Sequence, residues 1–133
     1  MMVFIDTSAF YAILSRSDSA HHAAATRWKT IVTGTSFSPV TSNYVAVETI
    51  ALLHNRLGVG AVEAFTCNII PIINMRWVDE AIHNAGVAAI LAGGNNGPSL
   101  VDTTSFAMMK AYGITRALAY DRHFFAQGFT IHQ

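Results

Sequence analysis

The sequence has few charged residues, and their charges cancel. Charged residues make up 12% of the chain, about half of the usual ~25%. There are 8 Lys and Arg residues and 8 Asp and Glu residues, so the formal net charge is zero. No run of basic residues indicates a surface for a polyanion. The scarcity of charge leaves much neutral or apolar surface, which favours a subunit interface or a bound partner.

Cysteine and long apolar runs are also scarce. The single Cys67 excludes an internal disulfide and fits a reducing compartment. The first apolar stretch ends at Asp6, too early for a signal peptide, and no run reaches the ~20 residues of a membrane span. We therefore expect a cytoplasmic protein with no membrane segment. Its length predicts a single domain over residues 1–133, large enough to bury roughly two-thirds of its unfolded surface.

The first informative feature of the sequence is a short apolar run that ends at an acidic residue. Residues 2–5 are bulky or β-branched, and Asp6, Thr7 and Ser8 follow at once. Such a run is typical of a strand buried on both faces in a parallel sheet. Ligands of parallel sheets bind beyond the carboxyl ends of the strands. Asp6 should lie at that edge.

The rest of the chain alternates between helical and extended patterns, which predicts an α/β fold with a mainly parallel sheet. Apolar periodicity and turn residues place the element boundaries. The expected further strands are 37–40, 68–73, 117–120 and 129–131, and the expected helices are 9–14, 21–32, 44–57, 61–67, 77–91 and 99–112, with a turn or short helix over 122–127.

Four acids stand where such a fold would bring them together. Asp6 and Asp121 each follow a strand, Asp102 lies in the first turn of a helix, and Glu48 lies among apolar residues of another helix. Strand carboxyl ends and the amino ends of the following helices share one edge. Clustered carboxylates repel one another unless a cation joins them, and hard oxygen ligands suit Mg²⁺ or Mn²⁺. A metal held there can activate water for phosphodiester hydrolysis.

Two of these acids have an equally plain structural interpretation. Asp102 lies three residues after Ser99, the spacing of a capping box at a helix start. Glu48 could form an ion pair with Arg56 two turns further along the helix, or with a neighbouring helix.

Four short motifs, taken together and in order, resemble the PIN-domain nucleases. They are Val3-Phe4-Ile5-Asp6-Thr7-Ser8, Tyr44-Val45-Ala46-Val47-Glu48, Ser99-Leu100-Val101-Asp102 with Ser105-Phe106, and Asp121-Arg122-His123-Phe124. The chain is most similar to the VapC-type ribonuclease toxins of toxin–antitoxin modules, and the resemblance extends over essentially all of it. It implies a three-layer α/β/α sandwich around a mainly parallel sheet. It further implies an endoribonuclease that depends on Mg²⁺ or Mn²⁺, forms homodimers and is inhibited by a small antitoxin.

The resemblance also implies roles for individual residues. Asp6, Glu48, Asp102 and Asp121 match the acidic quartet of the family. Asp6 and Asp102 are the expected direct metal ligands, while Glu48 and Asp121 would act through metal-bound water.

Residues beside the acids are expected to support the site. A hydroxyl of the first motif should support it by hydrogen bonding, and of Thr7 and Ser8 we favour Ser8. Arg122 and His123 are candidates either for contact with phosphate or for capping the local turn.

Two other function classes compete with this hypothesis. The first is a non-catalytic PIN-like module that binds RNA or protein through the same cleft. The low charge supports it, as does Ala119 at a position where relatives often carry Thr or Ser, and the four acids oppose it. The second is a phosphoacceptor domain similar to response regulators. Such domains pair their acids with a lysine at a strand end, and no strand of this chain is expected to end in lysine.

Overall fold

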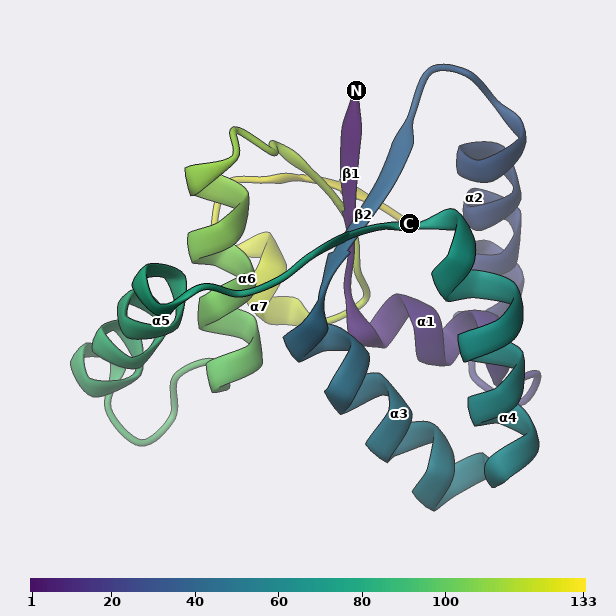
Figure 1. Ribbon diagram of the computed structural model, residues 1–133, viewed down its shortest axis with the longest axis horizontal. Helices are drawn as coiled ribbons and strands as arrows, with labels where there is room; N and C mark the ends of the chain where they lie inside the picture. The colour runs from purple at the N-terminus through teal and green to yellow at the C-terminus, as the bar shows by residue number, and fades with distance from the viewer.

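The fold is built on a sheet of five parallel strands in the order β3-β2-β1-β4-β5 (Figure 1). The computed structural model describes all 133 residues. Every pair of neighbouring strands is parallel, and Phe4 of β1 lies opposite both Val40 and Ala117. The strands are β1 (Met2–Ile5), β2 (Ser38–Ser42), β3 (Asn74–Arg76), β4 (Arg116–Leu118) and β5 (Thr130–His132).

Helices cover both faces of this sheet, so the predicted α/β/α architecture is confirmed. Figure 1 shows α2 and α4 on one side and α5, α6 and α7 on the other, with α1 and α3 leaving the lower ends of the central strands. The helices are α1 (Thr7–Leu14), α2 (His21–Thr33), α3 (Asn43–Leu57), α4 (Val59–Ala64), α5 (Glu80–Gly93), α6 (Leu100–Ala111) and α7 (Arg122–Phe125).

The core lies on both sides of β1. Val3, Phe4 and Ile5 are fully buried, as a central strand of a two-sided sheet requires. Aromatic pairs fill each layer, with Phe10 edge-on to Phe65 on one side and Phe106 edge-on to Phe124 on the other. The first strand predicted from the sequence is thus the centre of the molecule.

The strand predicted over residues 68–73 is wrong, because this segment is helical. It continues α4 as a π-helical turn, η1 (Phe65–Ile69), and a 3₁₀ turn, η2 (Ile70–Ile72). Pro71 stands in the first turn of η2, where the N–H that proline lacks has no helical partner. The strand of this region is β3, which begins at Asn74 on the edge of the sheet. A short apolar run does not by itself distinguish a strand from a buried helical turn.

Other helix and strand boundaries differ by a few residues from those predicted from the sequence. Helix α5 begins at Glu80 instead of residue 77, because the Asp79 side chain caps it by accepting a hydrogen bond of 2.8 Å from the N–H of Ile82. Strand β4 ends at Leu118, two residues earlier than expected.

The order of the strands creates a crevice between β1 and β4. From β1 the chain proceeds outward to β2 and β3, then returns to the other side of β1 to form β4 and β5. At such a topological switch point the connections diverge to opposite sides, and the carboxyl ends of the two strands border an open crevice. Asp6 follows β1, and its N–H donates to the carbonyl of Leu118 at the end of β4. The predicted edge acid therefore stands at the switch point.

Membrane insertion finds no support among the helices. None of them combines the length and the apolar character that a membrane crossing needs.

Candidate active site

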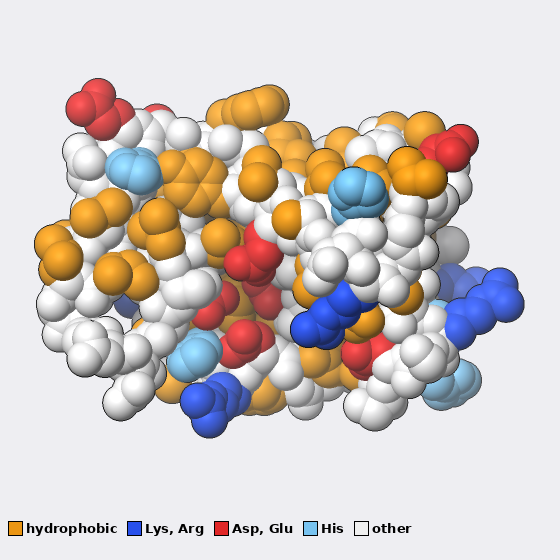
Figure 2. Space-filling model, turned by 90° about the horizontal axis from the view of Figure 1, so that it is seen from below, with side chains coloured by type: hydrophobic (Ala, Val, Ile, Leu, Met, Phe, Trp, Pro, Cys, Tyr) orange, Lys and Arg blue, Asp and Glu red, His pale blue; other side chains and the backbone are white.

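A polar cleft of about 500 Å³ opens at the carboxyl edge of the sheet. Figure 2 views the molecule from this side and shows acidic side chains gathered in a hollow near the middle of the face. All four predicted acids line the cleft, together with Thr7, Ser8, Ser99 and His123. No Lys or Arg lines it. Segments that are far apart in the sequence therefore place four carboxyl groups in one cleft, with His123 as the one basic side chain among them.

Asp6 is the most buried of these acids, with 3% of its surface exposed. It caps α1, and its Oδ2 accepts hydrogen bonds from the Ser8 N–H at 3.1 Å and from the Ser8 hydroxyl at 2.6 Å. Its Oδ1 is buried and has no partner. Burial raises the pKa of Asp6 to about 7, the bonds from Ser8 oppose this rise, and the charges of Asp102 and Glu48 add to it.

Asp102 is both a helix cap and a member of the cleft. The Ser99 Oγ accepts from the Asp102 N–H at 3.1 Å, and the Asp102 Oδ2 accepts from the Ser99 N–H at 3.3 Å, which completes the predicted capping box of α6. Burial and the nearby charge of Asp121 raise the pKa of the Asp102 carboxyl. Its Oδ1 makes no hydrogen bond within the protein.

Asp121 is the N-cap residue of α7, as Asp6 is of α1. Its Oδ1 accepts a hydrogen bond of 2.8 Å from the N–H of His123, and its Oδ2 makes none. Asp6, Asp102 and Asp121 thus each use one carboxylate oxygen to cap a helix and keep the other oxygen uncommitted. The caps hold the carboxylates in place, and the positive ends of three helices lie beside them.

Glu48 reaches the cleft from the middle of α3 and is partly buried. The alternative prediction of an ion pair with Arg56 is wrong. The Arg56 guanidinium lies over the ring of Tyr11 at 5.6 Å, and Glu48 has no ion-pair partner. The Glu48 carboxylate is therefore available to bind a ligand in the cleft.

The supporting residues occupy different positions. Ser8, the hydroxyl that the sequence favoured, bonds to Asp6 and also accepts from the N–H of Tyr120 at 2.9 Å. The Thr7 hydroxyl instead faces α3, where it donates to the Val45 carbonyl at 3.5 Å. Arg122 is exposed on α7 and does not line the cleft.

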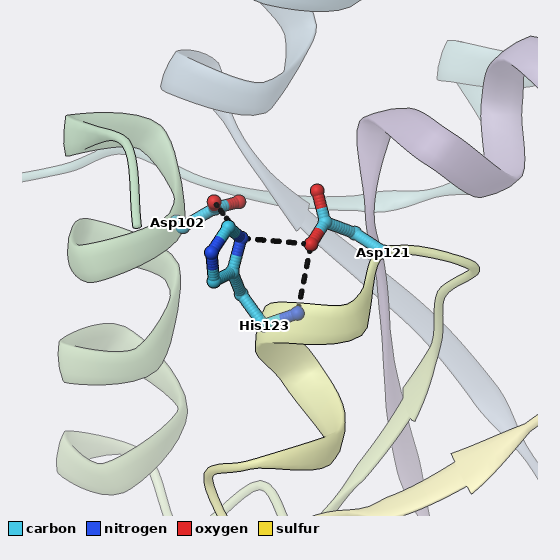
Figure 3. A group of neighbouring side chains, drawn as sticks. All are labelled: Asp102, Asp121 and His123. Carbon is cyan, nitrogen blue, oxygen red and sulfur yellow. Dashed lines mark hydrogen bonds and ion pairs between the residues drawn. The ribbon is translucent and has the colours of Figure 1, made fainter. Parts of the chain in front are cut away.

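The closest-spaced group in the cleft includes a residue that the sequence offered only as a phosphate contact or a cap. Ligand atoms of Asp102, Asp121 and His123 all lie within 4.8 Å of one another (Figure 3). The Nδ1 atom of His123 is 3.0 Å from Asp121 Oδ1 and 3.6 Å from Asp102 Oδ2. In the sequence, the only signal for His123 was its place two residues after Asp121. That spacing does not determine where the imidazole ring points.

The donor set fits a divalent cation such as Mg²⁺ or Mn²⁺. The Asp6 Oδ1 is a buried acceptor without a donor, and two further carboxylate oxygens are uncommitted. Oxygen-rich sites of this kind are what such ions require. Without a cation, repulsion and burial act in the same direction on the pKa of Asp6 and of Asp102. A bound cation would offset the cost of keeping these two carboxyl groups charged.

Comparison with known proteins agrees with this geometry. A sequence model of the PIN domain matches residues 3–129. The chain belongs to the PIN-domain family. It is 36% identical to the 23S rRNA-specific endonuclease VapC20 of Mycobacterium tuberculosis over 132 residues, which cover 96% of this chain and 95% of VapC20. The resemblance to VapC-type toxins inferred from the four motifs is confirmed.

Solved structures of PIN proteins share the fold. The crystal structure of M. tuberculosis VapC20, described as a Sarcin-Ricin loop cleaving toxin, superposes with a TM-score of 0.85 and 29% identity, and covers 96% of each chain. FitAcB from Neisseria gonorrhoeae superposes with a TM-score of 0.70 at 17% identity, over 100% of this chain and 97% of that one. At such low identity the second match concerns the fold alone.

Proposed function

We propose that this protein is an endoribonuclease that depends on a divalent metal ion and acts as the toxin of a toxin–antitoxin module. The observation that carries the proposal is the cleft at the switch point, which Asp6, Glu48, Asp102 and Asp121 line together and which no Lys or Arg lines. The likeness to VapC20 over nearly the whole chain supports the same activity.

The four carboxylates would hold Mg²⁺ or Mn²⁺, with Asp6 and Asp102 as direct ligands and Glu48 and Asp121 also facing the ion. When bound, the ion supplies positive charge for the scissile phosphate and lowers the pKa of water at the site. The protein positions the ligands: Ser8 orients Asp6, and the helix caps orient Asp102 and Asp121. Water would attack phosphorus and lose a proton to solvent, while one bond from phosphorus to a ribose oxygen breaks and that oxygen takes up a proton.

The protein has a formal net charge of zero, so it does not repel RNA as a whole, but the carboxylates of the cleft do. Four carboxylates repel a phosphate backbone, so the substrate and the cation must bind together. The exposed Arg122, next to Asp121 on α7, could contact a phosphate outside the cleft. VapC20 is named for 23S rRNA and for the Sarcin-Ricin loop. A hairpin of that loop is therefore the first substrate to test.

The protein's partners follow from the same relationship. VapBC2 from Rickettsia felis and FitAB were solved as complexes bound to DNA, and they share this fold. We expect a small antitoxin to bind and inhibit this protein. We also expect residues 1–133 to act as a single domain in the cytoplasm.

A homodimer is the expected state, and the outer face of α5 supports it. Leu91 is 79% exposed on that helix, and the small residues Ala81, Ala88 and Ala92 are exposed with it. An apolar face of this kind is typical of a subunit interface.

The function is tested by cleavage of end-labelled RNA with purified protein in Mg²⁺, Mn²⁺ or EDTA. The double variant Asp6→Asn, Asp102→Asn, purified in parallel, controls for contaminating ribonuclease. We expect cleavage that requires metal and is lost in the variant. Equal activity of both proteins would refute the assignment. RNA binding without cleavage under all three conditions would instead support the non-catalytic PIN-like module.

A further inference from the structure

His123 is the one nitrogen-bearing side chain that lines the acidic cleft. It lies at the start of α7, two residues after Asp121, and its ring is directed between Asp102 and Asp121 (Figure 3). The side chain is 28% exposed, but its Nδ1 atom is buried. The ring therefore turns this nitrogen away from solvent and toward the carboxylates.

The buried nitrogen has no hydrogen-bond partner. Its distance of 3.0 Å to Asp121 Oδ1 would suit a hydrogen bond, yet the direction of the ring nitrogen does not produce one. The contact with Asp102 Oδ2, at 3.6 Å, is too long. A buried polar atom without a partner is costly, so some group should satisfy it.

A divalent cation would satisfy both this nitrogen and the carboxylates. Adjacent ligands at about 2.0–2.1 Å from an octahedral metal ion lie about 3 Å apart. His123 Nδ1 lies 3.0 Å from Asp121 Oδ1 and 3.6 Å from Asp102 Oδ2, which is close to that value, although these are the two oxygens that also accept the capping hydrogen bonds. One ligand atom from each of Asp102, Asp121 and His123 lies within 4.8 Å of the other two, so each side chain can give one ligand to the same ion.

We infer that His123 is a direct metal ligand through Nδ1, and that it gives the site a preference for Mn²⁺ over Mg²⁺. The inference rests on the metal site of the proposed function and adds a nitrogen to its oxygen ligands. Mg²⁺ binds oxygen almost exclusively, whereas imidazole is a good ligand for the first-row transition metals. A mixed set of nitrogen and oxygen therefore shifts selectivity away from Mg²⁺.

Electron paramagnetic resonance of Mn²⁺ bound to the whole protein tests this directly. Electron spin-echo modulation detects a ¹⁴N nucleus that is bonded to the manganese. We expect nitrogen modulation in the wild-type protein and its loss in His123→Gln. The variant His54→Gln, which changes an exposed histidine on α3, should keep the signal. Neither substitution removes the backbone N–H of residue 123, which donates a hydrogen bond to Asp121.

Calorimetric titration gives a second measurement, without RNA. In His123→Gln, we expect the dissociation constant of Mn²⁺ to rise by about tenfold or more, and that of Mg²⁺ to change much less. His123→Asp restores an oxygen ligand, so it should bind Mg²⁺ at least as well as the wild type and lose the preference for Mn²⁺.

Each failure has a distinct meaning. Tight binding of Mn²⁺ without nitrogen modulation would overturn the role of His123 and leave the proposed nuclease intact. Equal losses of Mg²⁺ and Mn²⁺ affinity in His123→Gln would also overturn it, because they would indicate general disruption of the site. A wild-type protein that binds neither metal would refute both the inference and the metal-dependent function.

Discussion

The hydroxyl of Ser8 lies 2.6 Å from Oδ2 of Asp6, and it is the shortest hydrogen bond to any acid of the cleft. The Ser8 hydroxyl oxygen in turn accepts a hydrogen bond from the N–H of Tyr120 at 2.9 Å. Ser8 therefore joins the segment after β1 to the segment after β4, across the switch point. One small side chain both orients the most buried carboxylate and hydrogen-bonds to the backbone that follows β4.

Replacing Ser8 by alanine should weaken both the fold and the site. The Tyr120 N–H would lose its acceptor, at a cost of about 1–2 kcal/mol in the free energy of unfolding. The pKa of Asp6 should rise further, because the hydrogen bond from the Ser8 hydroxyl lowers it and only the bond from the backbone N–H would remain. Metal affinity should fall as a result. Chemical unfolding and calorimetric metal titration measure the two effects. Ser8→Thr, which keeps the hydroxyl, is the control, and equal losses in both variants would contradict the argument.

The stability of the metal-free protein should fall as pH rises through the range between the two pKa values of Asp6. The pKa is about 7 in the folded protein and 3.8 as the ordinary value. Below the lower value both states bind the proton. Between the two values only the folded state keeps it, so stability declines with rising pH, and above about 7 the loss is complete. At about 1.4 kcal/mol per pH unit, the contribution of Asp6 is at most about 4 kcal/mol.

Asp6→Asn isolates this contribution. The asparagine variant should lose less stability than the wild type between pH 4.5 and 7.5, since other titrating groups, including Asp102 and His132, are common to both proteins. Urea unfolding at several pH values in EDTA measures the difference. Parallel curves for the two proteins would show that Asp6 is not the group responsible.

Two substitutions of Asp102 should distinguish its role as a helix cap from its role as a charged residue of the cleft. Asp102→Asn removes the charge that repels the other acids, but its amide oxygen can still accept from Ser99, so the metal-free protein should be as stable as the wild type or more so. Asp102→Ala removes the cap as well and should cost about 1 kcal/mol relative to the asparagine variant. Both should lose metal binding. A marked loss of stability in Asp102→Asn would mean that its charge, acting on the helix end, outweighs the repulsion.

The sequence predicted the main part of this architecture because its signals were local and agreed with one another. The buried run before Asp6 identified the central strand, and the spacing of Ser99 and Asp102 identified the start of α6. For Asp102 the sequence offered a choice between cap and site. The structure shows that no choice is needed, because a carboxylate has two oxygens and the capping box uses one.

The remaining features depend on tertiary structure. The apolar run around Pro71 satisfies a strand pattern and a helical turn equally well. In the structure it continues the helix of α4 and η1, whose Phe65 and Ile69 are buried in the core. The role of His123 depends on the direction of one ring at the start of a four-residue helix, which periodicity does not report. The bond from Tyr120 to Ser8 joins residues 112 positions apart.

Close packing of α5 on α6 should make Gly86 intolerant of a side chain. A Cβ atom there would lie 2.4 Å from the Thr104 side chain and 3.2 Å from the Thr104 backbone nitrogen. Gly86→Ala should therefore cost about 1–3 kcal/mol of stability, although alanine favours helices. Gly60→Ala in α4 is the matched control, because nothing lies within 4 Å of its new methyl group. Thermal unfolding measures both. A neutral Gly86→Ala would mean that α5 can shift away from α6 without loss.

The outer face of α5 should hold the homodimer together. Leu91 is 79% exposed there, so Leu91→Glu would not disturb the core, but it would place a charge in an apolar interface and should dissociate the dimer. Val59→Glu is the control, since Val59 is 72% exposed at the start of α4, on the opposite side of the sheet (Figure 1). Sedimentation velocity at micromolar concentration should give a dimer for the wild type and Val59→Glu, and a monomer for Leu91→Glu. A monomeric wild type would refute the dimer itself, whereas a dimer in all three proteins would place the interface elsewhere.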